Sequence, residues 1–177
     1  AQYTGDVTAI KSAGPTSTLG GDTTATVSNG SATFTDLDLT GTSGSGFTLS
    51  FTLDSPYGSV SANSSSFSVA PGAVTQVLFT VQPSTPVYAG SAFTADVEVT
   101  LKDASNNIAT NAANNLTITT DSGASLTGGD TVIDMSSKSG VATLTGVKFA
   151  ATSSAGTYAL HGSYGAATGD SNDVRVN

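Results

Sequence analysis

The sequence predicts an all-β protein, and three observations support that prediction. Only 10% of the 177 residues are charged, although charged residues and leucine normally fill helix surfaces. Several stretches alternate between apolar and polar residues, which is the pattern of a half-buried strand. Segments rich in glycine, serine and asparagine separate these stretches and are typical of tight turns. We therefore expect antiparallel strands in sheets packed face to face, a β-sandwich.

One phrase of the sequence occurs twice, 110 positions apart. GSATFTDLDLT occupies residues 30–40, and the similar GVATLTGVKFA occupies residues 140–150. A repeat at a fixed offset is the signature of homologous structural units. We therefore predict two tandem units, residues 1–71 and 72–177, with Gly72 marking the junction after a proline.

The second unit contains about seven predicted strands, the usual number for an immunoglobulin-like sandwich. In AFTADVEVTLKD, one parity is apolar from Phe93 through Val97 to Leu101, while the other parity is polar. Pro83 and Pro86 cannot donate ladder hydrogen bonds and are expected to end the first strand. The predicted strands lie near residues 75–82, 92–102, 116–121, 131–136, 140–149, 157–164 and 172–177.

The first unit shows the same alternation in GFTLSFTL, residues 46–53. Its counterparts to the second unit begin only near residue 7, because the position aligned with Thr75 would precede residue 1. We therefore expect a partial immunoglobulin-like sandwich that lacks its two opening strands. Such a unit would expose apolar core and unpaired strand edges.

The charge balance excludes several classes of partner. Five basic and 13 acidic residues give a net charge of −8, whereas nucleic acids and anionic membranes bind cationic surfaces. No run of about 18 apolar residues predicts a membrane helix, and AQYTGDVTAI lacks the regions of a signal peptide. The absence of cysteine speaks against a small disulfide-stapled scaffold. We predict no nucleic-acid partner and no membrane insertion of this segment.

Four segments of the chain carry a family resemblance: VLFTVQPSTPVYAGSAF, VEVTLKDASNN, GVATLTGVKF and AGTYAL. They resemble bacterial immunoglobulin-like repeats, the tandem modules of invasin-like adhesins and other large surface proteins. The resemblance covers residues 74–177 and part of the first unit. It implies an extracellular or cell-surface location and neighbouring repeats as partners. The loop DASNN departs from the Asp-Ala-Asn-Gly-Asn that is common in the family.

Oxygen-bearing side chains in this loop make a candidate calcium site. Asp103, Asn106 and Asn107 lie on one turn, and calcium prefers several carboxylate and amide oxygens. The two GGDT turns, with Asp22 and Asp130, are a second candidate. The same residue types are also standard in tight turns, so both interpretations stay open. Calcium is the one cofactor that the sequence suggests.

Catalytic constellations are nearly absent. With no cysteine and one histidine, the usual hydrolytic arrangements would all require His161, which the parity of TYALHGSY places on the outer face. Two carboxylate pairs, Asp36 with Asp38 and Asp96 with Glu98, lack the apolar pocket that would raise a pKa. We predict that the protein is not an enzyme.

Three functions remain open. The first is a rigid, non-catalytic structural or adhesive segment of a bacterial cell-surface or extracellular protein. The second is a subunit of an extracellular filament or surface-layer lattice, in which identical subunits donate strands to one another. The third is a module binding host or matrix carbohydrates, with Tyr57 and Tyr88 as stacking platforms. Exposed aromatic platforms usually build such sites, and the chain has no tryptophan.

Overall fold

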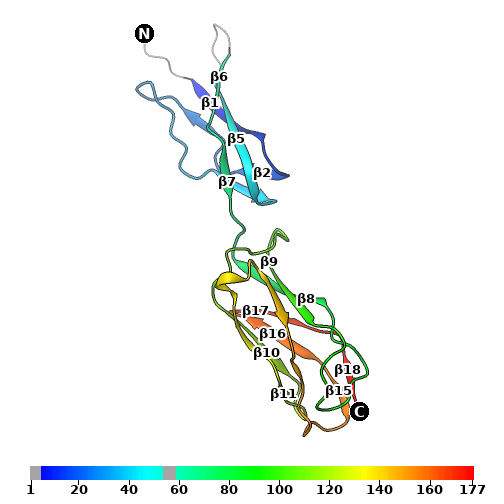
Figure 1. Cartoon of the computed structure of the whole chain (residues 1–177). Coiled ribbons are helices and arrows are strands. Elements are labelled where there is room, and N and C mark those ends of the chain that lie inside the picture. Colours follow the sequence, from blue (N-terminus) through cyan, green and yellow to red (C-terminus); the bar gives the residue numbers. More distant parts are fainter. Residues whose placement is uncertain (1–4, 54–58) are drawn as a thin grey trace. The chain divides into compact units, whose positions relative to one another are not determined.

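The structure is a computed structural model that describes residues 5–53 and 59–177. Within these residues the regular structure is β apart from one 3₁₀ turn, η1 (Met135–Ser137), which confirms the all-β prediction (Figure 1). The chain divides into two compact units, Ala1–Ala70 and Pro71–Asn177, hereafter unit 1 and unit 2. No helix in the described part of the chain has the length and apolar character needed to cross a bilayer.

Unit 2 is built from antiparallel strands in two larger sheets and two short pairs. The four-stranded sheet has the order β12 (Val132–Asp134), β10 (Asn115–Thr120), β16 (Leu160–Tyr164), β17 (Ala167–Asp170). The three-stranded sheet has the order β13 (Val141–Leu144), β9 (Val97–Asp103), β8 (Val74–Val81). The short pairs are β11 (Leu126–Thr127) with β14 (Lys148–Phe149), and β15 (Gly156–Tyr158) with β18 (Val174–Val176). β17 lies in the interval between two predicted strands, where the sequence analysis placed none.

The alternation of β9 places its apolar residues in the core. Val97, Val99 and Leu101 are 0% exposed. Two details of the prediction are wrong. The strand starts at Val97 rather than at residue 92, and Ala95 is exposed because it lies in a bend before the strand. Thr100 is buried rather than wet, because the Thr80 hydroxyl of β8 lies 3.1 Å from its own hydroxyl.

Unit 1 has one larger sheet and one short pair, again antiparallel. The larger sheet has the order β3 (Thr24–Thr26), β1 (Asp6–Ala13), β5 (Gly44–Leu53), β6 (Val60–Asn63), and β7 (Phe67–Val69) also pairs with β5. The short pair is β2 (Ser17–Gly20) with β4 (Asp38–Gly41).

The strand pairing of unit 1 reproduces that of the four-stranded sheet and short pairs of unit 2. β1 pairs with β3 and β5, as β10 pairs with β12 and β16. β5 pairs with β6 and β7, as β16 pairs with β17 and β15 pairs with β18. β2 pairs with β4, as β11 pairs with β14. The pairing register therefore defines which residues of the two units are equivalent.

The two copies of the repeated phrase are equivalent in their second half and differ in their first. β4 and β14 occupy the same place: β4 pairs with β2, and β14 pairs with β11. Residues 141–144 form β13, which pairs with β9, whereas residues 31–34 form only an isolated bridge from Ser31 to Ser28. The described residues of unit 1 contain no counterpart of β8 or β9, so the first half has no strand to pair with.

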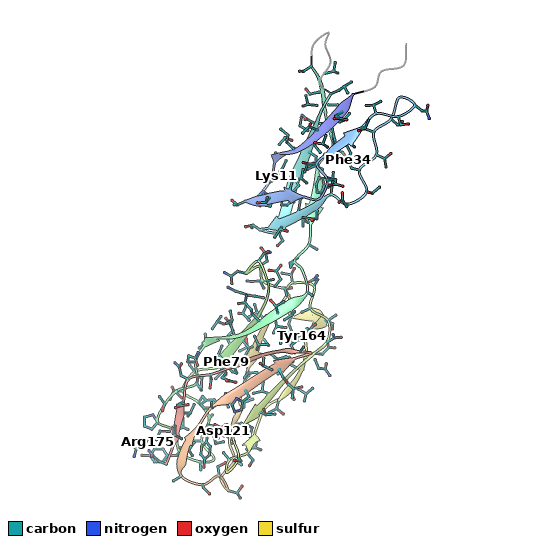
Figure 2. All side chains as sticks on the ribbon, turned by 180° about the vertical axis from the view of Figure 1, so that it is seen from behind. Lys11, Phe34, Phe79, Asp121, Tyr164 and Arg175 are labelled. Carbon is teal, nitrogen blue, oxygen red and sulfur yellow. The ribbon has the colours of Figure 1, made fainter. Side chains whose placement is uncertain are left out.

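The missing partner sheet changes how deeply the same residues are buried. In unit 2 four apolar residues of the phrase are at most 2% exposed: Ala142, Leu144, Val147 and Phe149. In unit 1 the aligned residues are only half-buried: Ala32, Phe34, Leu37 and Leu39. Phe34 instead packs on Phe51, with 5.4 Å between ring centroids (Figure 2). Unit 1 therefore keeps the phase of the pattern without completing its core.

Candidate functional site

The loop proposed for calcium is a turn organised by the buried side chain of Asp103, which is 4% exposed. Its Oδ1 accepts hydrogen bonds from the backbone N–H groups of Ser105 and Asn107, both at 2.9 Å. Its Oδ2 accepts from the Gly72 N–H at 2.8 Å and from Asn107 Nδ2 at 2.9 Å. Burial alone would raise the pKa of this carboxyl, but the bonds from Asn107, Gly72 and Ser105 outweigh it and lower the pKa.

Asn106 and Asn107 do not direct side-chain oxygens toward Asp103. Asn106 Oδ1 accepts a hydrogen bond from Lys102 Nζ at 3.0 Å, while Asn107 presents its amide nitrogen to the carboxylate. Four N–H donors thus face the oxygens that a cation would approach. Among the residues that the structure describes, no group of three or more histidine, cysteine or acidic side chains could hold a metal. The geometry accounts for this loop as a turn and adds no support to the calcium hypothesis.

The two GGDT turns expose their aspartates and are shaped by backbone contacts within their own units. In the first turn, the Asp22 N–H donates to Asp36 Oδ1 at 3.0 Å. The side chains of Asp22 and Asp130 are both exposed. In the second turn, a Cβ added to Gly129 would clash with the Thr145 carbonyl oxygen. Close backbone approach, rather than metal binding, explains the glycine at this position.

A histidine–carboxylate cluster lies on the four-stranded sheet of unit 2. His161 of β16 stands directly across from Asp170 of β17. Asp121, labelled in Figure 2, follows the end of β10. His161 Nδ1 lies 2.8 Å from Asp170 Oδ1, and Nε2 lies 2.9 Å from Asp121 Oδ1. Asp121 Oδ2 also accepts the Ala159 N–H at 2.7 Å. The His161 side chain is 37% exposed on the outer face of the sheet.

The two carboxylates favour the doubly protonated form of this histidine, because only imidazolium donates from both ring nitrogens. The hydrogen bond to Asp170, followed by that to Asp121, raises the pKa of His161. The Ala159 N–H, followed by His161, lowers the pKa of Asp121. A general base needs a free ring nitrogen near the reacting proton, and both nitrogens here are occupied. The cluster cross-links the end of β10 to β16 and β17.

The two aspartates of this cluster were not predicted from the sequence. A usable signal was present in YGAA, residues 164–167, where Tyr164 pairs with Ala167 and Gly165 has a left-handed φ of 58°. A two-residue hairpin of this kind makes strand pairing countable. Counting back from it pairs His161 with Asp170. Asp121 is distant in sequence and joins the cluster only through the pairing of β10 with β16.

The predicted carboxylate pairs act as hydrogen-bond acceptors or lie exposed. Glu98 Oε1 accepts from the Thr80 hydroxyl at 2.7 Å, and Asp96 Oδ2 accepts from the Thr145 hydroxyl at 3.3 Å. Asp36 and Asp38 are exposed. Asp38 lines an apolar groove of unit 1 but is exposed, and neither pair lies in an enclosed pocket of the kind that glycoside chemistry requires.

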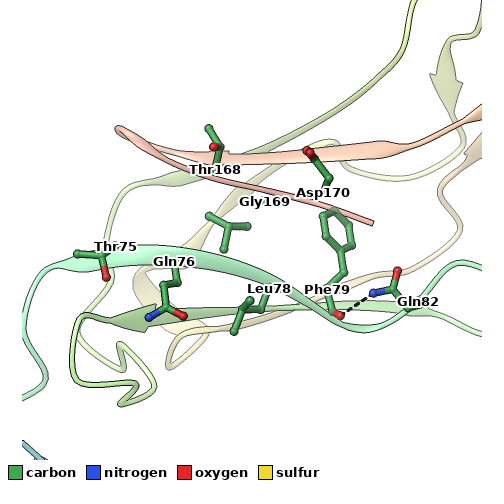
Figure 3. A pocket seen from close by; sticks show the side chains of 9 residues that line it. Thr75, Gln76, Leu78, Phe79, Gln82, Thr168, Gly169 and Asp170 are labelled. Atoms are coloured by element: carbon green, nitrogen blue, oxygen red, sulfur yellow. Dashed lines mark hydrogen bonds between the residues drawn. The ribbon is translucent and has the colours of Figure 1, made fainter. Parts of the chain in front are cut away.

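A pocket of about 400 Å³ lies in unit 2 between β8 and β17 (Figure 3). Its rim carries hydroxyl and amide groups, and Gln82 Nε2 donates to the Phe79 carbonyl at 3.0 Å. Its one carboxylate, Asp170, is already bonded to His161. Gly169 in its wall approaches the Val77 carbonyl so closely that an added Cβ would overlap that oxygen. The pocket offers hydrogen bonds without a paired nucleophile and base.

The aromatic platforms proposed for carbohydrate binding are not brought together in the described structure. Tyr88 is 68% exposed, in the segment after β8. Tyr57 lies outside the described residues. A single tyrosine gives one stacking surface.

An apolar groove on unit 1 is the site that most distinguishes the two units. It has a volume of about 310 Å³ and is open to solvent, and Asp38 and Ser68 are its polar lining residues. Its apolar lining comes from four strands and the segment before β4: Leu19, Leu37, Leu39, Leu49, Phe67 and Val69.

Comparisons with known proteins do not assign the chain to a family. No protein-family model matches it, and a search of curated proteins returned no significant match. The resemblance to bacterial immunoglobulin-like repeats therefore stays a prediction from the sequence.

Proposed function

We propose that this chain is a non-catalytic structural or adhesive segment of a bacterial cell-surface or extracellular protein. In this proposal immunoglobulin-like modules act as rigid repeats that hold a more distant surface away from the cell. A net charge of −8 and abundant hydroxyl side chains suit a solvated exterior. Neighbouring repeats of the same kind would be its partners.

The single observation that supports this proposal best is the repeated strand pairing. The same antiparallel connections occur in both units, which is the expected organisation of a tandem-repeat protein. Two polar clusters of unit 2 form hydrogen bonds within the unit. His161 is held by two carboxylates, and Asp103 accepts four hydrogen bonds. This use of polar groups favours a mechanical or spacing role over a catalytic one.

Force spectroscopy on the whole chain, held by its two ends, tests the spacer role. We expect unit 2, residues 71–177, to unfold in one step and to release a contour length of about 380 Å, at ~3.6 Å per residue. A Phe149→Ala variant should lower the force of that step, because it removes a fully buried ring. Extension of unit 2 without a force peak would contradict the proposal.

A second candidate function is a subunit of an extracellular filament or surface lattice assembled by strand complementation. The open apolar face of unit 1 favours it, because exposed sheet faces and edges recruit strands from other chains. The native mass of the purified chain over a range of concentrations tests this candidate. We expect polymers that persist on dilution and appear as fibres or sheets by electron microscopy. A stable monomer at all concentrations would contradict this candidate.

A further inference from the structure

The groove of unit 1 corresponds, residue by residue, to a filled part of unit 2. The pairing registers align its six apolar lining residues with Leu126, Val147, Phe149, Leu160, Val174 and Val176. The last five of these are buried in the core of unit 2, and Leu126 packs against that core. The difference lies in what covers them.

In unit 2 the segment after β8 provides that cover. It turns at residues 89–90, where Gly90 has a φ of 83° and the Ser91 N–H donates to the Tyr88 carbonyl at 2.9 Å. The Val87 N–H donates to the Arg175 carbonyl at 2.9 Å, and the Asn177 N–H donates to the Val87 carbonyl at 2.9 Å. Val87 thereby adds in parallel to the edge of β18, opposite Val176. Downstream, the Gly90 N–H donates to the Phe149 carbonyl at 2.9 Å.

The same segment also fills the groove with side chains. Val87 is 5% exposed and belongs to the core cluster. Phe93 packs edge-on against Phe149 with 6.0 Å between ring centroids. Tyr88, between them, points away and is 68% exposed. The covering segment therefore combines a backbone edge contact with two apolar anchors.

Unit 1 carries the matching edge and groove. β7 is equivalent to β18 and pairs with β5 alone within the described residues. Ser68 and Ala70 stand where Arg175 and Asn177 bond Val87 in unit 2. A strand edge next to an apolar groove is the arrangement that binds extended peptides by β-augmentation.

The path of β8 itself is not reproduced in unit 1. In unit 2, Val77 of β8 packs on the cross-strand pair Gly162 of β16 and Gly169 of β17. A Cβ on Gly162 would lie 2.8 Å from Val77 Cγ1. The equivalent pair in unit 1 is Phe51 with Ala62, and Phe51 is covered by Phe34. An added segment therefore follows the route of residues 86–93 rather than that of β8.

We propose that the groove of unit 1 binds a segment of another polypeptide that has the chemistry and the single strand-edge contact of residues 86–93. Such a segment adds to the free edge of β7 and inserts a branched aliphatic and an aromatic side chain beside Leu39 and Leu49. Residues 86–93 of an intact copy are already used in its own unit 2, so those residues of an identical subunit are not the donor. The inference starts from the same open face of unit 1 as the strand-complementation candidate, but it does not depend on that candidate, because the donor is not an identical subunit.

A labelled synthetic peptide of residues 83–96, PSTPVYAGSAFTAD, provides the probe, titrated with the whole chain and followed by fluorescence anisotropy. We expect saturable binding that weakens about tenfold or more in a Val87→Asp peptide, because a carboxylate is costly in an apolar groove. A Tyr88→Asp peptide is the matched control and should bind within about twofold of the parent, since that side chain is exposed in unit 2. Because these changes lie in the peptide, folding of the protein is not affected.

Variants of the chain locate the peptide on unit 1. Leu39→Asn should weaken binding, while Thr40→Asn, on the exposed side of the same strand, should not. Lack of saturable binding, equal weakening by the two peptide variants, or insensitivity to Leu39→Asn would each overturn the proposal. A dimer of the chain that excludes the peptide would also overturn it, because a second copy would then be the occupant.

The outcome is distinguishable from that of the assembly test. Peptide capture by a chain that remains monomeric supports the groove while contradicting self-assembly into polymers. Polymers formed by a chain that does not capture the peptide support assembly through another surface and overturn the groove.

Discussion

The two units share a strand-pairing scheme and differ in whether a second sheet covers it. In unit 2, β8, β9 and β13 lie against the four-stranded sheet and bury its apolar face. In the described part of unit 1, the sheet built on β1 and β5 has no such partner, and its apolar residues are mostly half-buried. The fully or nearly fully buried apolar residues described in unit 1 are Ala9, Val27 and Phe47.

In the described part of unit 1, local packing takes the place of part of the cover that β8 provides in unit 2. Glycines in unit 2 admit β8 at close range, whereas unit 1 has Phe51 and Ala62 at the same positions. The Phe34 ring then closes over Phe51. This packing reaches one end of the face and leaves the groove beside β7 open.

The largest expected effect comes from truncating equivalent core residues. Phe149→Ala should reduce the free energy of unfolding of unit 2 by about 3–5 kcal/mol, because it empties a fully buried site. Leu39→Ala, at the equivalent position, should cost unit 1 about 1 kcal/mol, because that side chain is only half-buried. Urea unfolding with a separate probe in each unit measures both. Equal losses would show that the two cores are equally complete.

Filling the glycine pair should have the next largest effect. Gly169→Ala drives a Cβ into the Val77 carbonyl oxygen, so β8 must move away; we expect a loss of about 2–3 kcal/mol. Ala62→Gly is the matched change in unit 1 and should cost under about 1 kcal/mol through chain entropy alone. Thermal unfolding followed by circular dichroism compares the two. A silent Gly169→Ala would mean that β8 does not approach β17 in solution.

Asp103 ends β9, a strand with no counterpart among the described residues of unit 1. Asp103→Asn should cost about 2 kcal/mol, because an amide cannot accept all four hydrogen bonds and is buried. The pKa of the Asp103 carboxyl is lowered in the folded state. The stabilisation from its hydrogen bonds is therefore present above the unfolded pKa of about 3.9 and is lost as pH falls through the folded pKa. Urea midpoints measured across this pH range check both statements. Asp173→Asn, at an exposed position, is the control and should leave the urea midpoints unchanged.

The same measurements test calcium binding. We expect the unfolding midpoint to be the same with millimolar calcium and with a chelator, because N–H donors occupy the Asp103 oxygens. A calcium-dependent rise that disappears in Asp103→Asn would restore the loop as a metal site.

The smallest expected effect belongs to His161, whose equivalent in unit 1 is Ser50. The pKa of His161 is raised in the folded state. The stabilisation from its ion pairs is therefore complete below the unfolded pKa of about 6.5 and is lost as pH rises through the folded pKa. The cluster is solvent-exposed, so the change should stay below about 1 kcal/mol. Urea midpoints near pH 5.5 and pH 8.5 should differ less in His161→Ser than in the parent. An unchanged pH dependence would show that the ion pairs contribute nothing.

Much of the fold was predictable from the sequence because alternation is a property of neighbouring residues. Val97, Val99 and Leu101 share a face in any extended strand, and the structure buries all three. Thr100 was predicted to lie on the polar, exposed face. It is buried because Thr80, 20 residues earlier, covers it. The partners of His161 escaped prediction for the same reason, since Asp121 reaches it through a strand pairing 40 residues apart in sequence.

The sequence by itself determined the all-β class, the repeated phrase and the phase of apolar residues along each strand. These follow from local preference and from spacing, which no distant residue can alter. Only the tertiary structure decided how deeply each apolar residue is buried, because burial depends on the strand that lies opposite. Leu39 and Phe149 occupy the same place in the same pattern, and the presence or absence of a covering segment separates a groove from a core.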